Sequence, residues 1–234
     1  MNPTPSHTQR RSTRVTRNER MTALAGAVLF VLILVELVVT ANLHALISVH
    51  IFVGMLLFGP LVVKLCSTGY RFYRYYSKSP VFVQKGPPHI LLRLLAPVLV
   101  FMTIVVLVSG CGLAIVGPNH AGWFLKVHAV SVCLWLPLIA VHILAHIRRA
   151  SRFIASDWSK RDAKRVSGRA GRLRLNIMGL VTGAIAAVVM IPISAPWDHW
   201  HIHPGLPSPL VAGILAAACA ILIAIPLFRK TNLR

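Results

Sequence analysis

The sequence predicts an all-α membrane protein with six transmembrane helices. Its 234 residues are 56% hydrophobic and only 13% charged, whereas soluble domains carry about 25% charged residues, so a soluble globular domain is excluded. Apolar runs also recur along the chain, each with about the 20 residues that a helix needs to cross a bilayer. These runs cover residues 21–43, 45–66, 90–116, 123–147, 175–193 and 209–228.

The basic residues predict the orientation of these helices. The chain has 25 Lys and Arg against 5 Asp and Glu, a formal net charge of +20. Of the 25 basic residues, 24 lie in residues 1–20, 64–93, 148–174 and 229–234, and only Lys126 falls near the opposite side. Because cytoplasmic loops retain Lys and Arg, we expect both termini in the cytoplasm. The charge therefore indicates topology and contact with anionic lipid rather than nucleic-acid binding.

Four segments follow from the order of polar and apolar stretches. Residues 1–20 are polar and basic, which is typical of a disordered cytoplasmic tail. Residues 21–147 hold four helices with short outer connections, which predicts a four-helix bundle. Residues 148–174 read as a basic cytoplasmic loop, and residues 175–234 as a C-terminal helix pair.

The C-terminal pair carries small residues at helical spacing and no intramembrane charge or histidine. Gly179 and Gly183 form one such pattern, and Gly213 and Ala217 form another. Small residues let helix backbones approach closely in lipid, so we assign this pair to packing or partner docking rather than chemistry.

Two histidines stand at one depth in the expected bundle. His50 and His128 each lie about 8–9 Å from the outer ends of the second and fourth helices. Parallel helices of a bundle can face each other, so the two imidazoles could take both axial positions of a haem iron. The alternative is that each histidine makes an interhelical hydrogen bond. Gly54, one turn beyond His50, could leave room for a flat macrocycle, although glycine is common in membrane helices.

A second haem would need ligands near the inner side. His142 follows His128 by 14 residues, which places it on the same helix face about 21 Å further along. Lys64 stands where the second ligand is expected. A protonated lysine cannot ligate iron. Lys64 could instead extend to the inner membrane–water interface, or pair with a haem propionate or an anionic quinone intermediate. His89 could serve as the ligand in its place, so the sequence is compatible with either one haem or two. His142 and His146 could each also be interhelical hydrogen bonders.

Glu36 and Trp135 are further candidates near these levels. Glu36 lies about 10 Å deep, where it could accept the Nδ1 hydrogen bond of a ligating histidine. A proton relay for quinol chemistry, or a protonated carboxyl bonded to a neighbouring helix, is the alternative. Trp135 stands midway between His128 and His142, where it bridges two redox centres or, as we favour, fills space.

The outer loop of residues 194–208 is rich in histidine and tryptophan. Alternating imidazoles could bind copper or zinc. A polar turn anchored by Trp197 and Trp200 at headgroup level is the interpretation that we favour. The candidate metal ligands are Asp198, His199, His201 and His203.

Residues 47–76, 85–117 and 125–146 together carry a resemblance to a known family. The stretches ISVHIFVGMLLFGPLVVKL and LKVHAVSVCLWLPLIAVHILAH within them are similar to the haem-binding cores of bacterial membrane cytochromes b, most of all an actinobacterial b561-like or ferric-reductase-like group. The resemblance implies non-covalent haem b in a bacterial cell membrane and electron transfer that serves a quinone pool or a partner oxidoreductase. It places His50, His128 and His142 at ligand positions. The sequence departs from the two-haem pattern at Lys64, where a fourth histidine is expected.

The chain has no Gly-x-Gly-x-x-Gly motif and no soluble region to hold a nucleotide. We therefore expect an electron-transfer subunit that depends on a soluble or membrane oxidoreductase partner, rather than a stand-alone enzyme, and we predict no catalytic residue. Two other classes stay open. One is an ion or proton transporter that uses Glu36 and the intramembrane histidines, and the other is a non-redox membrane anchor subunit.

Overall fold

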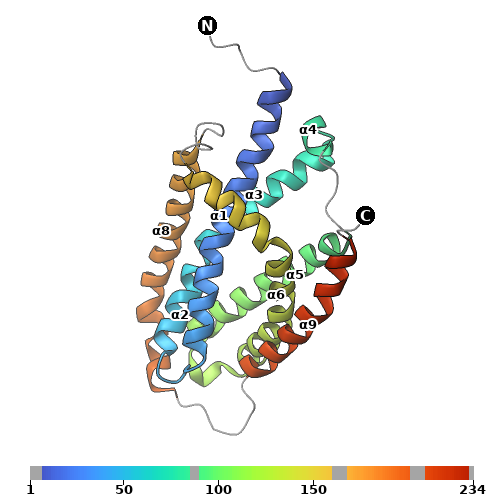
Figure 1. Cartoon of the computed structure of the whole chain (residues 1–234). Helices are drawn as coiled ribbons and strands as arrows, with labels where there is room; N and C mark the ends of the chain where they lie inside the picture. The colour runs from blue at the N-terminus through green and yellow to red at the C-terminus, as the bar shows by residue number, and fades with distance from the viewer. Residues whose placement is uncertain (1–6, 85–89, 160–167, 201–208, 232–234) are drawn as a thin grey trace. The chain divides into compact units, whose positions relative to one another are not determined.

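A computed structural model describes residues 7–84, 90–159, 168–200 and 209–231, and within them it is helical, without strands. The long apolar runs form helices because residues such as Leu, Ala and Met favour them and a helix satisfies its own backbone hydrogen bonds. Figure 1 shows the elements in chain order. They are α1 (His7–Thr40), α2 (Ile47–Leu56), α3 (Phe58–Tyr76), α4 (Pro80–Val83), α5 (Ile90–Val116), η1 (Pro118–His120), α6 (Gly122–Trp158), α8 (Arg169–Ser194), η2 (Ala195–His199) and α9 (Pro209–Thr231).

Five of the helical segments are long and apolar enough to cross a membrane. Only 6% to 28% of each apolar window is buried inside the protein, so the rest of that surface suits lipid rather than water. The last apolar helix, Leu210–Pro226, is shorter than these five. The all-helical prediction is therefore confirmed among the described residues, and five of the six expected spans correspond to helices that could cross a membrane. The five segments are Val15–Thr40, Ile47–Tyr76, Ile90–Val116, Gly122–Trp158 and Arg169–His199.

The second expected helix is longer than predicted and is interrupted. It runs to Tyr76 instead of ending near residue 66, and it divides into α2 and α3 at Leu57. Pro60 explains the break, because proline has no backbone N–H to donate to the carbonyl of Leu56. Leu57 itself keeps helical dihedral angles, so the two parts form one span of 30 residues.

Helix α1 begins at His7, so most of the segment expected to be a disordered tail is helical. The expectation failed because it treated the charges as solvated, whereas Glu19 and Arg20 are buried and paired. The expected loop 148–174 is likewise shorter, because α6 continues to Trp158 and α8 begins at Arg169.

The chain falls into two compact units, and each long helix that crosses the division contributes to both. The first unit holds the buried arginine–carboxylate pairs, and the second holds the paired histidines. The units therefore group the residues differently from the four segments expected along the sequence. The first comprises Met1–Val31, Leu57–Pro88 and Arg148–Gly183, and the second comprises Leu32–Leu56, His89–Ile147 and Ala184–Arg234.

Glycines set the closest helix contacts within each unit. In the first unit, a Cβ atom on Gly59 of α3 would lie 1.8 Å from the carbonyl oxygen of Gly179 in α8. In the second unit, a Cβ atom on Gly213 of α9 would lie 2.4 Å from a methyl carbon of Leu136 in α6. Gly179, Gly183 and Gly213 therefore lie at close helix contacts, in agreement with the packing role that was one of the two roles predicted for these small residues. Their contacts are with α3 and α6, however, whereas the sequence suggested a separate C-terminal pair.

Candidate functional site

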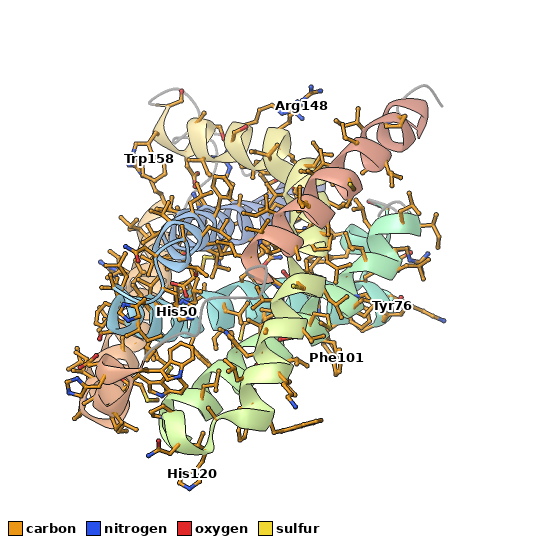
Figure 2. The ribbon with its side chains drawn as sticks, turned by 90° about the horizontal axis from the view of Figure 1, so that it is seen from below. His50, Tyr76, Phe101, His120, Arg148 and Trp158 are labelled. Carbon is orange, nitrogen blue, oxygen red and sulfur yellow. The ribbon has the colours of Figure 1, made fainter. Side chains whose placement is uncertain are left out.

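The two histidines predicted to share one depth lie together in the second unit. The ring centroids of His50 in α2 and His128 in α6 are 6.3 Å apart, and the ring planes cross at 77°. Figure 2 labels His50 on its helix. The two residues are far apart in sequence, so their proximity depends on how α2 and α6 are arranged within this unit.

The Nδ1 atom of His50 faces a carboxylate. Glu36 Oε1 lies 2.5 Å from it, with both side chains mostly buried. Thr40 Oγ1 lies 3.4 Å from the same nitrogen and donates to the Glu36 carbonyl at 2.7 Å. A carboxylate accepts hydrogen bonds, so His50 Nδ1 carries a hydrogen here and Nε2 is left with the lone pair or a second hydrogen. The contact expected between Glu36 and a candidate ligand is therefore present.

The Nδ1 atom of His128 is held in the same way by α5. It lies 3.0 Å from the carbonyl oxygen of Val106 and 3.1 Å from Ser109 Oγ. A carbonyl oxygen only accepts, so this Nδ1 also carries a hydrogen. Metal-ligating histidines commonly donate their second ring N–H to a carboxylate or a backbone carbonyl. Both rings thus have the hydrogen-bonding pattern of histidines that ligate through Nε2.

Two glycines border this site, and only one was singled out from the sequence. A Cβ atom on Gly110 would lie 3.0 Å from His128 Cε1, which is a tight contact with the ring. A Cβ atom on Gly54 would lie 3.8 Å from Glu36 Oε1, which is an ordinary contact. Gly110 therefore sets how closely α5 approaches the His128 ring, while Gly54 lies beside the carboxylate. The adjacent Ser109 and Gly110, which interrupt the apolar run of α5, were the signal that sequence reasoning missed.

The other intramembrane candidates have different surroundings. The rings of His142 and His146 stack on each other at 4.5 Å with planes 19° apart. Trp135 Nε1 donates to Thr103 Oγ1 at 2.9 Å. In the first unit, the Lys64 ammonium lies against Gly26, where a Cβ atom would be 2.7 Å away. His89 lies outside the described residues.

The outer turn is anchored by aromatic side chains. Trp197 is buried, donates to the Leu113 carbonyl at 3.0 Å and packs against the Trp200 ring at 5.1 Å. Asp198 accepts a hydrogen bond from Ser48. Trp197 therefore anchors the turn through contacts inside the protein, whereas the favoured interpretation placed its ring at headgroup level. His199 ends η2, whereas His201 and His203 lie outside the described residues.

Within the described ranges, no group of three or more His, Cys, Asp or Glu side chains could hold a metal ion. A haem iron has a smaller requirement, because the porphyrin supplies four of its nitrogen ligands and the protein supplies at most two. The paired histidines are therefore the candidate cofactor site of this unit.

Within the described residues, the fold and this site together define a helical protein that has five membrane-length apolar helices and a partly buried pair of histidines held through Nδ1. Comparison of the chain with known protein families, with curated proteins and with solved structures finds no match.

Proposed function

We propose that the protein is a membrane cytochrome b in which His50 and His128 hold one haem b between α2 and α6. The single observation that carries this proposal is the 6.3 Å separation of the two ring centroids. Two imidazoles that bind one metal ion from opposite sides have ring centroids about 6–6.5 Å apart, because each metal–nitrogen bond is about 2 Å long and each centroid lies about 1.1 Å behind the ligating nitrogen. The engagement of both Nδ1 atoms supports the same assignment.

When bound, haem b supplies a reversible one-electron change at its iron. The chain's own residues position the ligands for this chemistry. Glu36 and the Val106 carbonyl each accept the Nδ1 hydrogen of one histidine, which fixes the ring orientation and raises the basicity of Nε2.

The wider assignment rests on the sequence. We place the chain in a bacterial cell membrane as a six-span protein with cytoplasmic termini, which carries electrons between a quinone pool and an oxidoreductase partner. His142 is the candidate ligand of a second haem, with Lys64 as a group that could meet a propionate. The alternative with its own observation is a proton path through Glu36, because Glu36 Oε2 is buried without a hydrogen-bond partner among the described residues.

Haem content tests the proposal directly. Protein purified from cells that make haem b is expected to give a pyridine haemochrome spectrum with one or two haems per chain. His50→Ala and His128→Ala should each lower the ratio by about one haem per chain, since one axial ligand is lost. His120→Ala is the matched control, because His120 is exposed in η1 (Figure 2) and should leave the ratio unchanged.

Colourless wild-type protein, or equal haem content in all three variants, would contradict the cytochrome assignment. If the colourless protein also carried protons into vesicles and Glu36→Gln abolished that uptake, the proton-path alternative would be favoured instead.

A pair of glycine substitutions tests the position of His128. Gly110→Ala is expected to push the His128 ring by a few tenths of an ångström, at a cost of about 1 kcal/mol or more. Gly54→Ala makes the same chemical change on α2, the helix that carries His50, but creates only an ordinary contact with Glu36. Haem retained after detergent washing should therefore fall for Gly110→Ala and not for Gly54→Ala. Equal retention would show that Gly110 does not limit the ring position.

A further inference from the structure

The first unit contains a cavity of about 510 Å³ whose walls are rich in arginine. Arg20 of α1 lines one part, and the end of α6 lines the rest through Arg149, Arg152, Phe153 and Ser156. Arg148 and Trp158, which Figure 2 labels, lie on either side of these α6 residues in the chain. The cavity is separate from the paired histidines, which belong to the second unit.

Buried carboxylates hold the arginines around this cavity in place. Asp157 Oδ1 lies 2.5 Å from Arg20 Nη1 and 2.6 Å from Arg172 Nη2, and all three side chains are at most 7% exposed. Each arginine is therefore fixed by a charge-assisted hydrogen bond instead of moving freely in solvent.

A second carboxylate repeats the arrangement beside the cavity. Glu19 Oε1 lies 2.7 Å from Arg149 Nη2 and 3.8 Å from Arg71 Nη1. The Arg149 guanidinium also stands over the Phe153 ring, 5.5 Å from its centroid. Among the described residues, five arginines therefore gather near two carboxylates, which leaves an excess of three positive charges. The arginines are Arg20, Arg71, Arg149, Arg152 and Arg172, and the carboxylates are Glu19 and Asp157.

Arg20, one of the residues that line the cavity, has an unmet hydrogen-bond donor. Its side chain is 7% exposed, and its Nε atom is buried without a hydrogen-bond partner among the described residues. Buried N–H groups are nearly always paired, so this donor indicates an acceptor that the described residues do not supply. The surplus positive charge around the cavity favours an anion as that acceptor.

We propose that this cavity binds a phosphate group, which is donated either by the headgroup of an anionic phospholipid or by free phosphate. Guanidinium groups match phosphate oxygens in planar geometry and pair with them through charge-assisted hydrogen bonds. Arg20 and Arg149 are held in advance by their carboxylates, so little side-chain freedom is lost when the anion binds. Arg152, which is exposed and has no carboxylate partner in the described part of the chain, supplies the surplus charge.

The full chain tests this proposal with two probes. Native mass spectrometry of protein extracted from vesicles that contain phosphatidylcholine and phosphatidylglycerol reports retained anionic lipid. Calorimetric titration of delipidated protein in neutral detergent with inorganic phosphate reports the free anion. Arg152→Gln is expected to lower the affinity for whichever probe binds by about tenfold or more, since one charged hydrogen-bonding partner is lost.

Arg174→Gln is the matched control. Arg174 is exposed on α8 in the same unit, so its substitution changes the net charge equally but leaves the cavity wall intact. Lower affinity in Arg152→Gln alone supports the proposed phosphate site. The probe whose binding is lowered then identifies the source of the phosphate. Binding of neither probe to the wild type, or equal weakening by both substitutions, overturns the proposal. Because Arg152 is exposed, the variant should fold, and size-exclusion profiles that match the wild type confirm it.

Discussion

Replacing Gly59 with alanine is expected to destabilise the folded protein by about 2–3 kcal/mol or more. The new Cβ atom would lie 1.8 Å from the Gly179 carbonyl oxygen and 2.9 Å from the Gly183 backbone nitrogen. Both obstructing atoms belong to the backbone of α8, so no side-chain rotation relieves the overlap. The α3 and α8 backbones would have to move apart, which would remove packing along their whole contact.

Gly69→Ala is the matched control for this prediction, because Gly69 lies in the same helix and a Cβ atom there meets nothing within 4 Å. Alanine at that position should be neutral or stabilise α3 by about 0.5–1 kcal/mol. Unfolding of the purified chain by increasing dodecyl sulfate, followed by circular dichroism, measures the difference. Equal midpoints for the two variants would show that α3 and α8 are not held at the Gly59–Gly179 contact.

Asp157→Asn is expected to cost about 3–5 kcal/mol of folding free energy. The carboxylate lies between the buried guanidinium groups of Arg20 and Arg172, and it receives a second bond from Arg172 Nε at 3.1 Å. Asparagine keeps the shape but removes the negative charge, so two buried cations would face each other without compensation. The large cost is mainly that of the charges left behind, since an intact buried pair itself contributes little net stability.

Asp198→Asn supplies the comparison for the buried carboxylate. Asp198 also accepts a hydrogen bond, from Ser48, but this contact is exposed at the outer turn. Its substitution should cost no more than about 1 kcal/mol, because solvent screens an exposed charge. The thermal midpoint of monodisperse protein, measured by size exclusion after heating, should fall strongly for Asp157→Asn and little for Asp198→Asn. Similar losses in both would mean that the Asp157 pairs are not a stabilising centre.

Much of the helical architecture followed from the sequence. Apolar length is a local property, so the spans could be located without knowledge of their neighbours. The depth of a residue along a helix is also local, because each residue adds about 1.5 Å. From depth alone, the sequence predicted that His50, His128 and Glu36 lie at one level. In the structure, His50 contacts both His128 and Glu36.

The failures of the sequence interpretation share a cause. The basic stretch before Met21 was interpreted as a solvated tail, because a charge run says nothing about carboxylates distant in the chain. The pairing of Glu19 with Arg149, and of Arg20 with Asp157, makes that stretch part of a folded helix. Gly110 was likewise missed, since its role depends on a ring supplied by another helix.

The sequence by itself determined where the apolar helices lie along the chain, although not all of their ends, and which polar residues share a position along neighbouring helices. Only the tertiary structure decided which helices meet at Gly59 and Gly179, which groups hold the Nδ1 atoms of the two histidines and which arginines surround one cavity. The physical reason is that length, hydropathy and rise are properties of one helix. Contacts between side chains depend in addition on how each helix is rotated about its axis and on which neighbour it packs against.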